Sequence, residues 1–113
     1  MVKDNYIPER GDVIWLNFSP QIGHEQQGKR PAVVISPQVY NQKTGLALLC
    51  PITTKEKGYP FEVRINNVKI HGVVLSDQIK SLDWKQRGAE FIVKSRNSEM
   101  SEIMEKLSVL IFS

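Results

Sequence analysis

The sequence predicts a mainly β fold, a small barrel with one α-helix packed on it at the C-terminus. Three features support this prediction: short runs of β-branched and aromatic residues, prolines and glycines that separate these runs, and an apolar stripe of helical period in the last residues. Short apolar runs at such spacing are typical of antiparallel barrels and sandwiches. With 113 residues, we expect a single domain that spans residues 1–113.

Six apolar runs are predicted to form strands. They cover residues 13–18, 32–35, 46–50, 61–65, 73–75 and 91–93. The run 61–65 alternates apolar and charged residues, so we expect one of its faces to be buried and the other to contact water. All side chains in the run 32–35 are apolar, which predicts a central strand.

Two short helical segments are also predicted. Ser36 is followed by Pro37, a pattern typical of an N-cap with proline at the first helical position, and Gly45 can end the helix that follows. The segment from Ser81 to Gly88 is predicted to form a single helical turn.

The C-terminal segment predicts a longer, amphipathic helix that begins at Ser98. Its apolar residues recur at three- and four-residue spacing and are Met100, Ile103, Met104, Leu107, Leu110 and Ile111. Glu99 and Glu102 lie in the first turns, where the helix dipole favours negative charge.

Composition favours a soluble globular protein, because 41% of residues are hydrophobic and 24% are charged. There is no run of about 18 apolar residues, so no membrane span is predicted. The N-terminus lacks the apolar core of a signal peptide, so we expect a cytoplasmic protein. One cysteine, Cys50, and two histidines make a structural zinc site unexpected, and we predict neither a metal nor another cofactor.

The net charge of +3 is unevenly distributed along the chain. Residues 1–20 carry −1 and residues 97–113 carry −2, so residues 21–96 carry +6. A basic body of this kind suits a polyanion or an acidic protein partner.

Three polar segments are candidates for a functional site. Gly23–Pro31 contains an imidazole, a carboxylate, two amides, a lysine and an arginine, more than a simple hairpin requires. The segment Pro51–Pro60 holds two threonines, two lysines and a tyrosine, which can contact a phosphate backbone and stack on a base. Ser76–Lys80 adds an acid, an amide and a base. The alternative interpretation of each segment is a solvated surface loop.

Four motifs occur in order with characteristic spacing. They are Gly11-Asp12-Val13-Ile14-Trp15, Gly23-His24-Glu25-Gln26-Gln27-Gly28-Lys29-Arg30-Pro31, Pro51-Ile52-Thr53-Thr54 and Gly72-Val73-Val74-Leu75-Ser76-Asp77-Gln78. In these motifs, from about residue 9 to the C-terminal helix, the chain resembles the MazF/PemK family of toxin–antitoxin ribonucleases. The resemblance implies an SH3-like barrel of the PemK/CcdB type that forms a homodimer and cuts single-stranded RNA at short motifs without metal. It also implies an acidic antitoxin partner similar to MazE or PemI.

The resemblance also implies roles for individual residues. It puts the key arginine of the family on Arg30, the key threonine on Thr53 and the acidic residue of the first loop on Glu25. In metal-free cleavage the 2′-hydroxyl of the RNA attacks the adjacent phosphorus and expels the 5′-oxygen. Arg30 can bind the phosphate with two hydrogen bonds, and Thr53 can orient it. Either Glu25 or His24 is the candidate base.

The PemK branch of the family also involves a loop histidine and a later aspartate, which match His24 and Asp77. That branch carries an arginine two residues before the aspartate, whereas this chain has Leu75, so an arrangement built on Arg30 and Thr53 is favoured over one built on Asp77. Candidate RNA-binding residues are Lys57, Gln78 and Lys80.

Two other functions are compatible with the same superfold. One is a protein-binding toxin that poisons gyrase, as CcdB toxins do, which would not need the arrangement of Arg30 and Thr53. The other is a catalytically silent RNA-binding module that retains the barrel and its basic groove.

Overall fold

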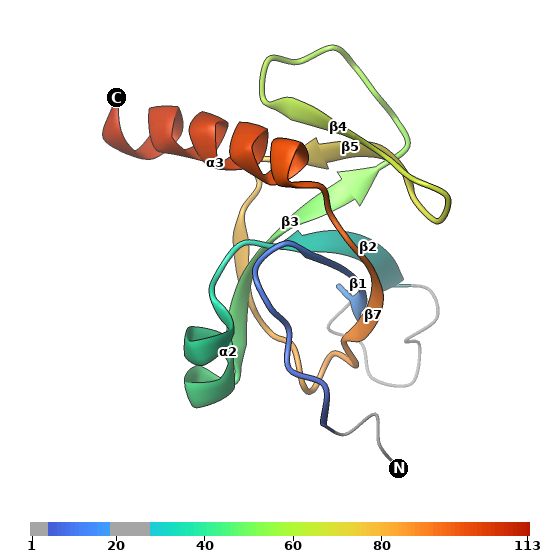
Figure 1. The fold of residues 1–113 in the computed structure, drawn as a ribbon, viewed down its shortest axis with the longest axis vertical. Helices are drawn as coiled ribbons and strands as arrows, with labels where there is room; N and C mark the ends of the chain where they lie inside the picture. The colour runs from blue at the N-terminus through green and yellow to red at the C-terminus, as the bar shows by residue number, and fades with distance from the viewer. Residues whose placement is uncertain (1–4, 19–27) are drawn as a thin grey trace.

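The computed structural model describes residues 5–18 and 28–113, whose strands form one curled antiparallel sheet with a long helix at the C-terminus (Figure 1). The strands are β1 (Asp12–Asn17), β2 (Lys29–Val34), β3 (Leu46–Thr53), β4 (Glu62–Asn66), β5 (His71–Leu75), β6 (Lys80–Asp83) and β7 (Glu90–Lys94). The helices are α2 (Gln38–Thr44) and α3 (Asn97–Phe112). The predicted mainly β fold with a C-terminal helix is confirmed.

Strand β3 connects the two parts of the sheet. The strand order is β4-β5-β3-β2-β1-β7, and β6 also pairs with β3. The first half of β3 pairs with β6, whereas its last residues, Ile52 and Thr53, pair with β5. Its other edge pairs with β2, which lies between β1 and β3 as predicted for a central strand. The predicted barrel is therefore a curled sheet, in which β4 and β7 stand at opposite ends of the order.

Apolar residues pack on both faces of the sheet because side chains alternate along each strand. Val13, Val33 and Cys50 belong to one core cluster, which also receives Ile103 and Leu107 from α3. The other face carries a second cluster, formed by Ile14, Leu16, Ala32, Val34, Ala47, Leu49 and Trp84. We call this second group the rear core. On β4 the predicted alternation is confirmed, because Val63 and Ile65 are fully buried while Arg64 is exposed.

Helix α2 begins one residue later than predicted, with Pro37 rather than Ser36 at the N-cap. The Ser36 hydroxyl donates to Asn41 Oδ1 at 2.5 Å and accepts a hydrogen bond from the Leu48 backbone N–H at 2.9 Å. Because the Ser36 hydroxyl bonds to the buried side chain of Asn41 and to β3, it does not cap the helix. Gly45 ends the helix with φ of 75°, as predicted.

The predicted helical turn over residues 81–88 is wrong in its first half. Residues from Lys80 to Asp83 form β6, because the first half of β3 has an edge with which they pair. A turn follows only after Asp83, whose Oδ1 accepts hydrogen bonds from the backbone N–H groups of Lys85 and Gln86 at 3.1 and 3.0 Å.

Helix α3 begins at Asn97 and is joined to the sheet by Glu99. The Glu99 carboxylate is buried and accepts hydrogen bonds from the backbone N–H groups of Arg96 at 2.8 Å and Asn66 at 3.3 Å. One residue thus caps the helix and connects it to the end of β4. Within the described ranges, no helix is long and apolar enough to cross a membrane.

Replacing Glu99 with alanine should leave two backbone donors without their acceptor in a partly buried place. We expect Glu99→Ala to lower the free energy of unfolding by about 2 kcal/mol. Urea denaturation monitored by circular dichroism measures this change. Glu105→Ala, at an exposed position of the same helix, is the control and should change stability little. Equal destabilisation by the two variants would contradict the capping role.

Candidate functional site

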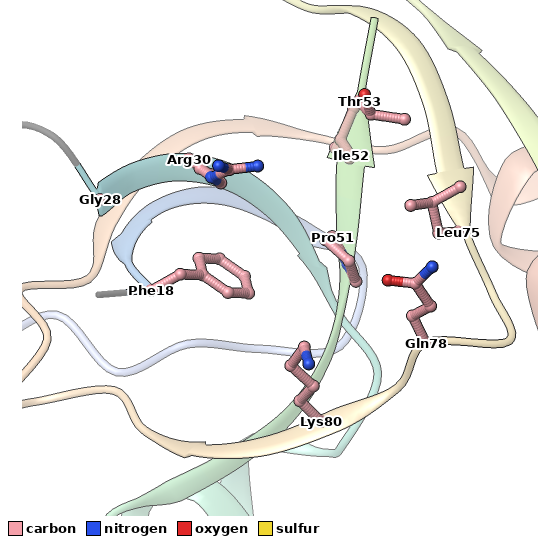
Figure 2. A pocket seen from close by; sticks show the side chains of 9 residues that line it. All are labelled: Phe18, Gly28, Arg30, Pro51, Ile52, Thr53, Leu75, Gln78 and Lys80. Carbon is pink, nitrogen blue, oxygen red and sulfur yellow. The ribbon is translucent and has the colours of Figure 1, made fainter. Parts of the chain in front are cut away.

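A cleft of about 500 Å³ opens on the sheet where β2 and β3 meet the segment that joins β5 to β6 (Figure 2). It is lined by Phe18, Gly28, Arg30, Pro51, Ile52, Thr53, Leu75, Gln78 and Lys80. Four residues that the sequence singled out, Arg30, Thr53, Gln78 and Lys80, thus come together from distant parts of the chain. Figure 2 shows Arg30 and Thr53 on neighbouring strands at the same end of the cleft.

The register of β2 and β3 explains why Arg30 and Thr53 line the same cleft. Ala32 pairs with Pro51 in this antiparallel ladder. Continuing the register by two residues on each strand brings Arg30 level with Thr53. Residues two apart share a face, so both side chains extend from the face that carries Ala32 and the rear core. The cleft is therefore the open, polar continuation of the rear core.

Phe18 forms the apolar part of the cleft next to this core. Its side chain is half-buried and packs against the rear core, and its ring is directed into the cleft (Figure 2). The Phe18 backbone N–H donates to the Gly28 carbonyl at 2.8 Å, and Arg87 Nη1 donates to the carbonyl of Phe18 at 3.2 Å. These bonds hold both ends of the segment that contains His24 and Glu25. Those two predicted residues themselves lie outside the described residues.

The Thr53 hydroxyl is oriented by a local backbone hydrogen bond. Its Oγ1 accepts a bond from the Lys55 N–H at 3.1 Å. This arrangement is the side chain–backbone turn expected of a threonine at a strand end. The Lys55 N–H uses one acceptor position of Thr53 Oγ1, and the hydrogen of the Thr53 hydroxyl remains available to donate. Thr53 can therefore present a hydrogen-bond donor to an oxygen atom bound in the cleft.

The cleft is positively charged at its rim. Arg30 and Lys80 are both exposed, and among the described residues no carboxylate forms an ion pair with either side chain. The neighbouring Lys29 differs, since its Nζ lies 3.3 Å from Glu90 Oε1. Because a guanidinium group forms paired hydrogen bonds with phosphate oxygens, this rim suits a phosphate group.

Two other predicted residues do not line the cleft. Lys57 is exposed in the β3–β4 loop, and Asp77 is exposed beyond the end of β5. Burial raises the pKa of the Cys50 thiol to about 12, and the negative charge of Asp77 contributes to the increase. Cys50 is fully buried, as predicted, and stays protonated at neutral pH.

The cleft lining also includes Phe18, Gly28 and Pro51, which were not predicted as individual site residues, although Gly28 and Pro51 belong to two of the candidate segments. Phe18 was assigned only to the first apolar run. Its position just after the end of β1, before a glycine-flanked polar segment, is the signal that could have identified it. No group of three or more His, Cys, Asp or Glu side chains in residues 5–18 and 28–113 is arranged to hold a metal ion.

Comparison with known proteins gives consistent matches along the chain. Residues 9–111 match the family described as the PemK-like, MazF-like toxin of type II toxin–antitoxin systems. The endoribonuclease toxin MazF of Escherichia coli K12 is 49% identical over 106 residues, covering 94% of this chain and 96% of that protein. The endoribonuclease EndoA of Bacillus subtilis is 33% identical over 110 residues, covering 91% and 93%.

Solved structures agree with these matches. A crystal structure of MazF from Deinococcus radiodurans superposes with a TM-score of 0.86 at 46% identity, covering 96% of this chain and 100% of that one. A MazE–MazF crystal structure from the same organism gives a TM-score of 0.85 at 41% identity, covering 96% and 98%.

Gly72 of β5 lies directly against the backbone of Thr53. A Cβ atom at Gly72 would lie 2.5 Å from the Thr53 carbonyl oxygen, and the φ angle of 152° is unfavourable for other residues. We expect Gly72→Ala to lower the free energy of unfolding by about 2–3 kcal/mol and to shift the backbone NMR signals of Thr53. Gly88→Ala is the control, because φ there is 67° but nothing lies within 4 Å of the added Cβ. Equal effects of the two substitutions would show that this close approach is unimportant.

Proposed function

The chain belongs to the family of PemK-like, MazF-like toxins of type II toxin–antitoxin systems, and from this premise we propose that it is an endoribonuclease that cuts single-stranded RNA at short sequence motifs. The observation that carries the proposal is the joint presence of Arg30 and Thr53 at one end of an open, positively charged cleft. An RNA strand can enter this cleft from solvent, because Arg30 and Lys80 at its rim are exposed.

In the proposed reaction the 2′-hydroxyl of the RNA attacks the adjacent phosphorus and the 5′-oxygen leaves. The products carry a 2′,3′-cyclic phosphate and a 5′-hydroxyl. Arg30 stabilises the negative charge that accumulates on the phosphate oxygens, and the Thr53 hydroxyl donates a hydrogen bond to the same group. Glu25 or His24, in the segment between Phe18 and Gly28, takes the proton from the attacking hydroxyl, and the leaving 5′-oxygen takes a proton from solvent water to become the 5′-hydroxyl. No metal ion or other cofactor takes part in this scheme.

The rest of the cleft binds the nucleotides on either side of the reacting phosphate. Phe18 offers an aromatic surface on which a base can stack, an interaction worth about 1–3 kcal/mol in single-strand binding. Gln78 supplies an amide that can hydrogen-bond to a base edge, and Lys80 supplies a charge for a phosphate. Asp77 lies outside the cleft lining, so we assign it no part in the reaction.

An acidic antitoxin similar to MazE is the proposed protein partner. The family consists of toxins that have antitoxins, and the solved D. radiodurans structures include MazE–MazF complexes. The positive rim formed by Arg30 and Lys80 would attract acidic side chains as it attracts phosphates, so antitoxin and RNA would compete. We propose that both partners meet the protein in the cytoplasm.

A second copy of the chain is the proposed partner of a separate apolar groove. This groove, of about 510 Å³, has Tyr40, Ile79, Met104, Leu107, Ile111 and Phe112 in its lining. The last turns of α3 extend it as an exposed apolar surface, with Ile111 63% and Phe112 82% exposed. The predicted helical stripe is thus only partly covered within one chain, and contiguous apolar surface of this kind marks an interface. A homodimer would bury it.

Arg30→Ala tests the proposed catalytic site. Long single-stranded RNA is incubated in EDTA with the wild type and the variant, and the cut ends are mapped by primer extension. We expect discrete wild-type cuts with 2′,3′-cyclic phosphate ends, and a rate about 10²–10³-fold lower in the variant, because the transition state loses a preorganised charge. Lys43→Ala removes the same charge at an exposed position of α2, and this variant should cut at the wild-type rate.

The two other functions predict different results in this experiment. A silent RNA-binding module would bind the RNA and leave it intact. A gyrase poison would leave the RNA intact and inhibit DNA supercoiling. Cleavage that persists unchanged in Arg30→Ala would contradict the role of Arg30.

Ile111→Asp tests the proposed homodimer. A charge in the apolar groove would cost desolvation energy at the interface, so we expect the variant to sediment as a monomer at micromolar concentration while the wild type sediments as a dimer. Val68→Asp is the matched control, since Val68 is 94% exposed and lies between β4 and β5, outside the groove. A monomeric wild type, or a dimeric Ile111→Asp, would argue against this interface.

A further inference from the structure

The loop between β3 and β4 is held in shape by carboxylates. It begins directly after Thr53 and projects from the sheet (Figure 1). The carboxylate of Glu62, the first residue of β4, accepts hydrogen bonds from the backbone N–H groups of Lys57, at 3.1 Å, and Gly58, at 2.9 Å. Gly58 has a φ of 80°, so the chain turns sharply at this point. The Glu62 side chain therefore links the tip of the loop to the start of β4.

Two further interactions fix the rest of the loop. Arg64 Nη2 lies 2.6 Å from Glu56 Oε2, which joins the middle of the loop to β4. Lys106 of α3 donates a hydrogen bond to the Pro60 carbonyl, which joins its end to the C-terminal helix. With the bond from the Lys55 N–H to Thr53 Oγ1 at the other end, the loop is connected to the protein along its whole length.

These interactions leave the loop with an excess of available positive charge. Both acidic groups are engaged, Glu56 with Arg64 and Glu62 with backbone N–H groups. The ammonium groups of Lys55 and Lys57 are exposed, and among the described residues neither forms an ion pair. Carboxylates that would otherwise repel a polyanion thus serve to orient the segment that carries these lysines.

The position of the loop relates these lysines to the cleft. Lys57 is four residues from Thr53, so it lies at most ~14 Å from it along an extended chain. The loop begins directly after Thr53, so an RNA strand that leaves the cleft at the end of β3 would pass along it. The loop is therefore placed to meet phosphates that flank the cleavage site, not the reacting phosphate itself.

We infer that Glu62 is a positioning residue for RNA binding, which holds the β3–β4 loop in the shape that presents Lys55 and Lys57 to the phosphates flanking the cleft. The inference rests on the proposed ribonuclease function. A loop ordered before binding loses less conformational entropy when it meets RNA, so its contribution to affinity is larger. Glu62 touches no RNA in this arrangement and acts through the backbone of Lys57 and Gly58.

The test compares Glu62→Ala with wild type on two RNAs that share the mapped cleavage motif, one that spans only the cleft and one extended on both sides. We expect the KM for the extended RNA to rise about three- to tenfold, with kcat unchanged and with little effect on the short RNA. The slope of log KM against log salt concentration should fall by about 0.7 for each phosphate that the loop no longer neutralises. Glu105→Ala makes the same charge change at an exposed position of α3 and should match the wild type.

A double-mutant cycle separates positioning from a general loss of stability. If Glu62 acts through Lys57, then Lys57→Ala should weaken binding in the wild-type background and have little further effect in Glu62→Ala. Dissociation constants are measured with the extended RNA carrying a 2′-deoxy group at the cut site, so that cleavage does not interfere. Glu62→Gln, which retains one acceptor oxygen, should fall between wild type and Glu62→Ala.

The possible failures can be told apart. If the wild type does not cut RNA, the proposed function fails and the inference fails with it. If the wild type cuts and Glu62→Ala has the same KM for the extended RNA, only the inference is overturned. Equal losses on the short and extended RNAs would also overturn it, because they indicate general unfolding. Fully additive effects of Lys57→Ala and Glu62→Ala would overturn it as well, because they show that the two residues act independently.

Discussion

The pairing of β3 with three other strands positions the parts of the functional site relative to one another. One edge of β3 fixes the register of β2 and hence the position of Arg30 beside Thr53. The opposite edge pairs first with β6, which carries Lys80, and then with β5. Because a one-residue slip in a ladder moves every side chain to the other face, these pairings must all be correct for the cleft to exist. The absence of a side chain at Gly72 allows β5 to lie against the Thr53 carbonyl.

The cleft and the core share one face of the sheet, which links stability to function. On this face, Ala32 of β2 and Leu49 of β3 belong to the rear core. Further along the same face of the two strands, the polar residues Arg30 and Thr53 line the cleft. Paired strands therefore carry Arg30 and Thr53, the two residues of the proposed catalytic site that the structure describes. In the proposed reaction these two strands hold the phosphate.

Three carboxylates on and around β4 are used to build structure. Glu99 caps α3 and binds β4, Glu56 pairs with Arg64, and Glu62 binds the backbone of its own loop. Arg30 and Lys57 remain exposed at the surface. The same distribution of charge suits both proposed partners, RNA and an acidic antitoxin, because each would present negative groups to the same surface.

The sequence alone determined the elements that depend on local pattern. Alternation predicted β4, an all-apolar run predicted the central strand β2, and three- and four-residue spacing predicted α3, because these periods are properties of the chain itself. The motifs around Arg30 and Thr53 likewise predicted the two residues on which the proposal depends. Only the tertiary structure decided β6, the N-cap at Pro37 and the lining by Phe18. Each of these depends on a partner distant in sequence: the edge of β3, the backbone N–H of Leu48, which engages the Ser36 hydroxyl, and the rear core.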